Sequence, residues 1–190
     1  ISYVNDEHRI YSGNGDGTFI DMTAESTFGG IGTVGGPSTA LDFNSDGLLD
    51  VYIGYFGDYL HAISPTLARK NKNGLPNKLF KNLGGFKFEE VKLSGAEDNG
   101  WSQSIGHSDI DGDNLQDLIV GNDFGTNTYY INQGDGTFLD KTRELGTDKP
   151  SFTMNVGITD LNQDHRPDFY ISNIVVMEKD EKYVNPSANS

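Results

Sequence analysis

The sequence predicts an all-β fold built from repeated four-stranded antiparallel sheets. Three observations lead to this prediction. An acidic loop occurs three times, an aromatic hairpin motif occurs three times at matching intervals, and glycine is frequent, with 24 residues in a chain of 190. Frequent glycine suits tight turns between short strands and argues against a helical bundle.

The acidic loop is followed each time by an apolar run. The copies read DFNSDGLLDVYIGYF from Asp42, DIDGDNLQDLIVGND from Asp109 and DLNQDHRPDFYISNI from Asp160. In DLIVGND the apolar residues do not alternate with polar ones, as expected for a strand that packs on both faces.

The second motif pairs an aromatic residue with a phenylalanine eight positions later: Tyr11 with Phe19, Phe80 with Phe88, and Tyr130 with Phe138. Asp135-Gly136, in the third copy, is a strong hairpin signal because both residues tolerate positive φ. Both motifs recur at intervals of about 50 to 70 residues, so each interval is expected to be one structural unit.

Each unit is expected to hold four short strands, which in the second complete unit are residues 101–109, 117–123, 128–133 and 137–142. Such a sheet cannot bury both faces alone, and radial repetition gives a β-propeller. We therefore expect a partial propeller over residues 1–175, comprising a half blade at 1–23, blades at about 36–93 and 100–143, and a half blade at 150–175. Residues 176–190 are expected to be a polar tail or a truncated continuation. Propellers close with roughly four to eight blades, so the ring is expected to be completed outside this sequence, by a longer chain or a partner.

The first complete unit carries an insertion between its second and third strands. Leu60 to Lys72 are expected to form a short helical turn, which Pro65 limits. Arg69, Lys70 and Lys72 make this segment locally basic. A solvated loop is the expectation, with a partner or ligand contact as the alternative.

The acidic loop has the pattern of a calcium site, because Ca²⁺ takes 6–8 oxygen ligands from a flexible loop. Side chains at loop positions 1, 3 and 5, the carbonyl at 7 and the carboxylate at 9 can surround one ion. The predicted ligands are Asp42, Asn44, Asp46, the Leu48 carbonyl and Asp50; Asp109, Asp111, Asp113, the Leu115 carbonyl and Asp117; and Asp160, Asn162, Asp164, the Arg166 carbonyl and Asp168. Up to three Ca²⁺ ions are expected.

Two other structures share parts of this pattern. An EF-hand begins similarly but places a glutamate at position 12, where this chain has Ile53, Val120 and Ile171. Ordinary Asp- and Asn-rich turns are the other alternative, which three copies in register disfavour. The second loop holds four carboxylates and is expected to bind Ca²⁺ most strongly. Loop position 6 needs a sharp turn with positive φ, which Gly47 allows, Asn114 tolerates and His165 adopts less easily. The third loop, with His165 and Pro167, is therefore expected to be the weakest or most distorted.

These motifs resemble the FG-GAP/VCBS repeats of calcium-binding β-propellers, which also occur in the integrin α-subunit head. NKLFKNLGGFKFEEV and GWSQSIGHSDIDGD look closest to the branch with cartilage acidic protein and the ASPIC/UnbV proteins. The resemblance covers residues 8–175. It implies a secreted, periplasmic or surface location and a role in interaction, without a common ligand.

Composition and charge restrict the kinds of partner and chemistry that we expect for this protein. The net charge of −14 would repel a phosphate backbone, so nucleic acid is not expected. No apolar run reaches the roughly 20 residues of a membrane span. The absence of cysteine excludes disulfides, thiolate catalysis and Cys-based zinc sites.

No enzyme activity is expected. Gly30, Gly32 and Gly35 have dinucleotide-loop spacing, but Pro37 and a strand follow instead of a helix. Ser104 and His107 would point to opposite faces of a strand, so they cannot form a triad with Asp109. The four histidines show no metal-ligand spacing.

Two functions remain: a non-catalytic scaffold for a protein partner, and a carbohydrate-binding or carbohydrate-active propeller. Trp101 is expected in the inter-blade core, with sugar stacking as its alternative role.

Overall fold

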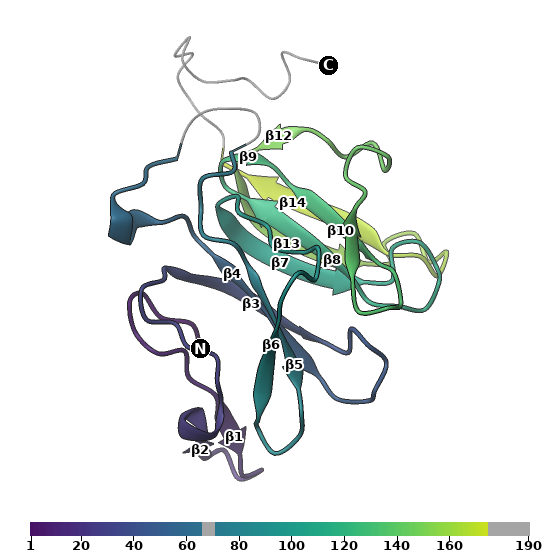
Figure 1. The fold of residues 1–190 in the computed structure, drawn as a ribbon. Coiled ribbons are helices and arrows are strands. Elements are labelled where there is room, and N and C mark those ends of the chain that lie inside the picture. Colours follow the sequence, from purple (N-terminus) through teal and green to yellow (C-terminus); the bar gives the residue numbers. More distant parts are fainter. Residues whose placement is uncertain (66–70, 175–190) are drawn as a thin grey trace.

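The computed structural model describes residues 1–65 and 71–174 and consists of antiparallel β-sheets (Figure 1). The first four-stranded sheet has the spatial order β3 (Gly35–Leu41), β4 (Asp50–Tyr55), β5 (Lys78–Asn82) and β6 (Phe88–Val91). The second has the order β7 (Ser102–Ser108), β8 (Asp117–Asn122), β10 (Thr128–Asn132) and β11 (Phe138–Asp140). The predicted all-β, antiparallel class is therefore confirmed.

Three two-stranded sheets accompany these. They pair β1 (Tyr11–Gly13) with β2 (Phe19–Asp21), β9 (Gly125–Thr126) with β12 (Pro150–Ser151), and β13 (Thr153–Thr159) with β14 (Asp168–Asn173). The described residues do not close into a ring, and the number of blades stays a prediction.

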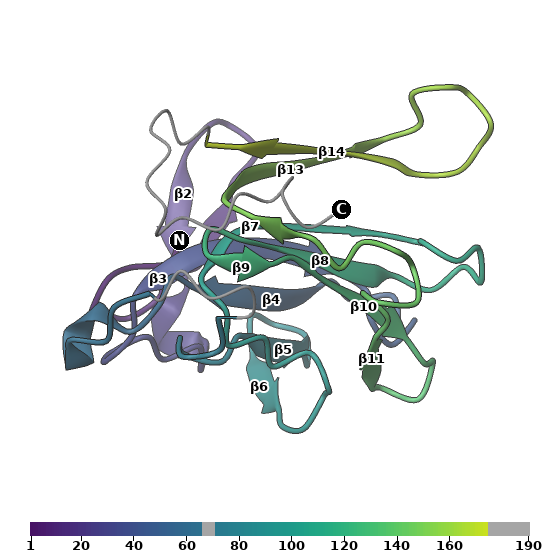
Figure 2. The ribbon, with the colours of Figure 1, turned by 90° about the horizontal axis from the view of Figure 1, so that it is seen from above.

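The larger sheets and the β13–β14 pair lie in layers, as Figure 2 shows from above. Strand β7 packs between β3 on one side and β13 on the other. Glycines permit this close approach: a Cβ on Gly106 would lie 2.6 Å from Cδ1 of Ile158, and a Cβ on Gly54 would lie 2.8 Å from Cδ1 of Ile105. The main core spans both four-stranded sheets and includes Leu41, Tyr52, Leu79, Leu118, Val120, Tyr130 and Phe138.

The first residues of the chain pair with the segment before β1. The Ile1 ammonium donates to the Arg9 carbonyl at 2.7 Å, and the Arg9 N–H donates to the Ile1 carbonyl at 2.9 Å. Between this region and the first sheet lies a cavity of about 210 Å³, lined by His8, Phe28, Val51 and other residues. Ile10 and Phe28, which flank the half sheet in the sequence, pack with Ile53, Tyr55, Phe80 and Phe88 of the first sheet beside this space.

The insertion differs from its prediction. The expected helical turn at Leu60–Lys72 is, in its described part, a single 3-10 turn, η2 (Tyr59–His61), which ends where Ala62 adopts a positive φ of 58°. Residues 66–70 lie outside the described residues, so the predicted basic positions Arg69 and Lys70 fall there. The predicted tail at 176–190 also lies outside them.

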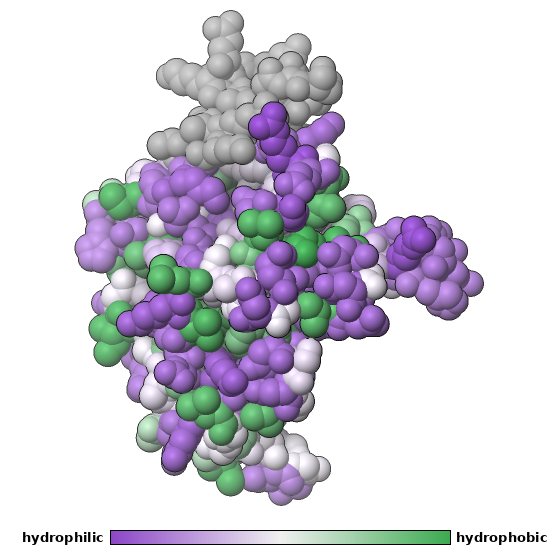
Figure 3. Space-filling view, turned by 45° about the vertical axis from the view of Figure 1, so that its right-hand side comes forward, coloured by the Kyte–Doolittle hydropathy of each residue, from purple (hydrophilic) through white to green (hydrophobic). Residues whose placement is uncertain are grey.

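In the described part of the chain, no helix has the length and apolarity to cross a bilayer. The surface in Figure 3 mixes hydrophobic residues among hydrophilic ones over the body, whereas the lobe that projects to the right is hydrophilic. Short η1 (Thr23–Glu25) follows β2.

Candidate metal centres

The three acidic loops share one backbone arrangement, held by the carboxylate at position 1. Its two oxygens accept the N–H groups of positions 5 and 6 in every copy. The distances are 3.1 and 2.9 Å for Asp42, 3.1 and 2.9 Å for Asp109, and 3.1 and 2.8 Å for Asp160. The loop therefore folds around its first side chain.

Positions 3 and 5 repeat in the same way. The position-3 oxygen of Asn44, Asp111 and Asn162 accepts the N–H of position 5 at 3.1, 3.3 and 2.9 Å. The position-5 carboxylate then accepts the N–H of position 7. These bonds join Asp46 to Leu48 at 3.0 Å, Asp113 to Leu115 at 2.8 Å, and Asp164 to Arg166 at 2.9 Å. A carboxylate accepts at about four lone-pair sites, so these bonds leave room for a cation.

The turn requires positive φ at two positions. Position 6 has φ of 83° at Gly47, 69° at Asn114 and 67° at His165, as the sequence led us to expect. Position 4 also has positive φ, 57° at Ser45, 85° at Gly112 and 63° at Gln163, which sequence reasoning missed. Non-glycine residues adopt this region only at a cost, so the third loop, with no glycine at either position, is the most strained.

The carboxylate at position 9 lies at the start of the second strand in each unit. Asp50 and Asp117 are both fully buried. Asp50 accepts the N–H groups of Phe43 at 3.1 Å and Asn82 at 2.8 Å. Asp117 accepts those of Ile110 at 2.6 Å and Asn132 at 2.8 Å. In each sheet, one of the two N–H groups belongs to the acidic loop and the other belongs to the third strand.

Asn82 and Asn132 are supporting residues that sequence reasoning missed. The side-chain Nδ2 of Asn82 donates to the Leu49 carbonyl at 2.8 Å, and that of Asn132 donates to the Gln116 carbonyl at 3.1 Å. Asn132 also donates to the Phe43 carbonyl of the first acidic loop at 2.7 Å. The available signal was an asparagine two residues after Phe80 and after Tyr130.

The second loop concentrates the most negative charge. Oxygen atoms of Asp109, Asp111 and Asp117 lie within 4.8 Å of one another, and Asp113 is not in this group. Burial raises the pKa of Asp117 to about 6, with Asp111 and Asp113 adding repulsion. Burial likewise raises the pKa of Asp50. A divalent cation would relieve this repulsion and is the ligand that such oxygen-rich loops suit.

The third loop differs at its closing carboxylate. Asp168 is partly exposed and accepts one N–H in the described structure, from Leu161 at 2.8 Å. Its loop hydrogen bonds otherwise match those of the first two copies. The described structure supplies no third strand beside β14 to bury it.

Position 12 falls inside strands in all three copies, at Ile53 in β4, Val120 in β8 and Ile171 in β14. An EF-hand would start a helix there. The sequence-based rejection of an EF-hand is therefore confirmed.

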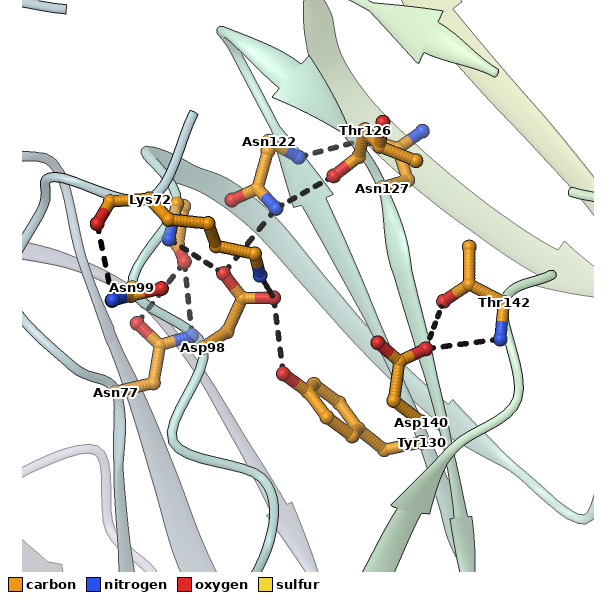
Figure 4. Close-up of polar contacts among 12 residues, drawn as sticks. Lys72, Asn77, Asp98, Asn99, Asn122, Thr126, Asn127, Tyr130, Asp140 and Thr142 are labelled. Carbon is orange, nitrogen blue, oxygen red and sulfur yellow. Dashed lines mark hydrogen bonds and ion pairs between the residues drawn. The ribbon is translucent and has the colours of Figure 1, made fainter. Parts of the chain in front are cut away.

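A separate polar cluster surrounds Asp98, which is fully buried (Figure 4). Its carboxylate accepts the Gly100 N–H at 2.7 Å and the Tyr130 hydroxyl at 3.2 Å, and it lies 3.5 Å from Nζ of Lys72. Lys72 also accepts a hydrogen bond from Asn99 through its carbonyl, at 3.1 Å. The cluster ties the end of the insertion to the second sheet.

A cavity of about 30 Å³ lies beside this cluster, lined by residues that include Lys72, Asn127, Asp140 and Thr142. A water molecule needs roughly 10–15 Å³ of such space, so this cavity holds no more than a few waters. It is too small for a sugar ring.

The residues considered for catalysis are engaged elsewhere. The Ser104 hydroxyl accepts the Val156 N–H of β13 at 3.0 Å, whereas Nδ1 of His107 lies 2.7 Å from the Thr39 hydroxyl of β3. The two side chains thus face opposite neighbours of β7, as predicted, and form no triad. Burial lowers the pKa of His107.

Trp101 is fully buried and packs edge-on against Phe56, Tyr59 and Phe124. Its indole N–H donates to Oδ1 of Asn73 at 2.9 Å. Core packing is therefore its role, and it offers no face for stacking on a sugar.

The glycine run Gly30–Gly35 leads into β3, and a Cβ on Gly30 would lie 2.5 Å from the Asp6 carbonyl oxygen.

Comparisons with known proteins extend these observations. A search of curated proteins found no match. A scan of protein-family models matched residues 109–171 to the FG-GAP-like repeat family. The matched segment contains the second and third acidic loops and the strands between them. This match supports the FG-GAP repeat family for that part of the chain.

Proposed function

We propose that this chain is a non-catalytic, calcium-stabilised β-propeller scaffold that serves protein interaction or adhesion outside the cytoplasm. The observation that carries the proposal is the threefold recurrence of one loop geometry, with each loop joining the first two strands of a sheet. A loop that merely turned the chain would not need four acidic or amide side chains at the same positions in every copy.

Calcium is the cation that fits the donor set. The predicted ligands are all oxygens, and the loops have no cysteine and no histidine at a ligand position. Ca²⁺ accepts irregular coordination by carboxylates, amides and carbonyls, whereas Mg²⁺ demands near-ideal octahedral geometry. Bound Ca²⁺ would neutralise a loop such as 109–117 and stabilise the strands that it connects.

A role in interaction is favoured by the sheet edges and apolar side chains at both ends of the described structure. Phe19 is 70% exposed and Tyr170 is 67% exposed. Exposed apolar faces and free edges invite a partner or further blades. The FG-GAP match favours a location outside the cytoplasm, and NKLFKNLGGFKFEEV favours the cartilage acidic protein and ASPIC/UnbV branch within that family.

Thermal unfolding with and without chelator tests the proposal. EDTA should lower the melting temperature by roughly 10 °C or more, because a ligand that binds only the folded state stabilises it. Added Ca²⁺ should restore the melting temperature more fully than Mg²⁺ at the same concentration. A melting temperature that EDTA leaves unchanged would contradict the proposal.

A further inference from the structure

The first two acidic loops are joined by one buried side chain, that of Asn132 in β10. Its Nδ2 donates to the Phe43 carbonyl of the first loop at 2.7 Å and to the Gln116 carbonyl of the second loop at 3.1 Å. Its backbone N–H donates to the Asp117 carboxylate at 2.8 Å. An amide NH₂ group has two donors, and both are used here. Asn132 is 2% exposed, so solvent does not readily replace these bonds.

Phe43 extends the link to the closing carboxylate of the first loop. Its N–H donates to Asp50 at 3.1 Å, while its carbonyl accepts the Asn132 side chain. The Phe43 ring is 3% exposed and lies 6.3 Å from the ring of Phe138, between centroids. The first loop is therefore seated on the second sheet. Three hydrogen bonds in series join Asp50 to Asp117 through Phe43 and Asn132.

The other loops provide two comparisons. Asn82 has the same repeat position as Asn132, but its Nδ2 donates to the Leu49 carbonyl of its own loop, at 2.8 Å. In the third loop, the counterpart of Phe43 is Leu161, which is 68% exposed. The side-chain hydrogen bonds described for residues 160–168 join residues of that loop to one another. The third loop is thus a reference for a loop without the link.

We propose that Asn132 is a positioning residue that couples the first two acidic loops, so that a divalent cation bound at one loop tightens binding at the other. The inference rests on the calcium binding proposed above. Residues in one hydrogen-bond network affect each other's energies. When Asp117 is held by a cation, its bond to the Asn132 N–H fixes that residue, whose Nδ2 holds Phe43, whose N–H in turn orients Asp50. Coupling between binding sites is reciprocal, so the effect runs in both directions.

Calcium titrations followed by NMR test the coupling one loop at a time in the full chain. The position-6 N–H donates to the first carboxylate of its own loop in every copy, so these amides report the three sites separately: Gly47, Asn114 and His165. Asp113→Ala, in the second loop, should weaken Ca²⁺ binding at Gly47 about fivefold or more. Asp164→Ala, in the third loop, should change it by less than about twofold.

Asn132→Ala tests whether this residue carries the coupling. The substitution removes Nδ2 but keeps the backbone N–H that donates to Asp117. In this background, Asp113→Ala should change Ca²⁺ binding at Gly47 by less than about twofold. The matched control is Asn82→Ala, which removes the asparagine at the same repeat position of the first sheet. It should leave the effect of Asp113→Ala at about fivefold or more.

Hydrogen exchange in EDTA tests the link without metal. The Phe43 amide should exchange about fivefold faster or more in Asn132→Ala than in Asn82→Ala, because only the first substitution deprives the Phe43 carbonyl of its donor.

Equal effects of Asp113→Ala and Asp164→Ala at Gly47 would overturn the coupling and leave the proposed calcium binding intact, and this comparison needs no change at Asn132. A fivefold effect that persists in Asn132→Ala, or equal exchange of the Phe43 amide in the two asparagine variants, would overturn the role of Asn132. A lack of any Ca²⁺ response at the three reporter amides would instead contradict the proposed function, and the coupling with it.

Discussion

The complete second sheet and the two half sheets place the same kinds of residue at the same repeat positions, yet bury them very differently. Phe138 in β11 is 4% exposed and its counterpart Phe19 in β2 is 70% exposed. Ile119 in β8 is fully buried and its counterpart Tyr170 in β14 is 67% exposed. The closing carboxylate follows the same trend, from buried Asp117 to partly exposed Asp168.

This difference separates what is local in the fold from what is not. The acidic loop is local, because its hydrogen bonds join residues within the same nine positions and are equally present in the complete and incomplete sheets. Burial of the second strand and of the closing carboxylate needs strands from elsewhere in the chain. We therefore expect local loop geometry in all three copies, with stability and cation affinity set by the surrounding sheet.

The largest contrast is expected at the phenylalanine of the fourth strand. Phe138→Ala should lower the free energy of unfolding by about 3–5 kcal/mol, because it leaves a cavity in the core. Phe19→Ala, at the same repeat position but exposed, should change it by less than about 0.5 kcal/mol. Urea denaturation of both variants measures this contrast, and similar losses would show that β2 is covered in solution.

The closing carboxylates should give the next largest contrast. In EDTA, Asp117→Ala should cost about 2–4 kcal/mol, because the Ile110 and Asn132 N–H groups lose their acceptor and each unsatisfied buried group costs about 1–3 kcal/mol. Asp168→Ala should cost about 1 kcal/mol, since its carboxylate is partly exposed.

The matched control is Asp117→Asn, which keeps an acceptor and should lose less than the alanine variant. These measurements use urea denaturation without metal, so they report the hydrogen bonds alone. A larger loss at Asp168 than at Asp117 would contradict the role assigned to the sheet.

The smallest contrast concerns the position three residues before the aromatic residue of the hairpin motif, which is occupied by Asn77, Asn127 and His8. Asn77 and Asn127 accept the N–H groups of Tyr55 and Asn122 there, at 3.0 and 2.9 Å. His8 takes this position in the first half sheet, and its Nδ1 accepts the Tyr3 N–H at 3.3 Å. Burial, with the N-terminal ammonium and Lys78, lowers the pKa of His8 below 6.5.

Because the unfolded chain then binds a proton at higher pH than the folded chain, stability falls as the pH drops below about 6.5. His8→Asn removes this titration. Between pH 7.5 and 5.5, the unfolding free energy of the variant relative to the native chain should rise, because only the native chain loses stability through this titration. Urea denaturation at the two pH values measures it, and an unchanged difference would show that His8 is free to ionise in the folded state.

The sequence was sufficient to predict the repeated strands, because each unit carries its own turn and loop signals. The acidic loop and its positive φ at Gly47, Asn114 and His165 followed from residue type and spacing. The supporting roles of Asn82 and Asn132 could not be predicted, because they depend on which strand lies beside β4 and β8. The helical turn expected near Leu60 was wrong in extent, since glycine at 57 and the left-handed Ala62 confine the described turn to three residues.

Calcium titration by isothermal calorimetry tests the central claim most directly, namely that the acidic loops bind Ca²⁺ and that the second loop binds it best. The metal-free native chain should bind Ca²⁺, Asp113→Ala should lose the tightest site, and Asp164→Ala should retain it, because the two variants remove position 5 from the most acidic loop and from the loop with the partly exposed Asp168. Absence of Ca²⁺ binding by the native chain, or equal losses in the two variants, would contradict the account.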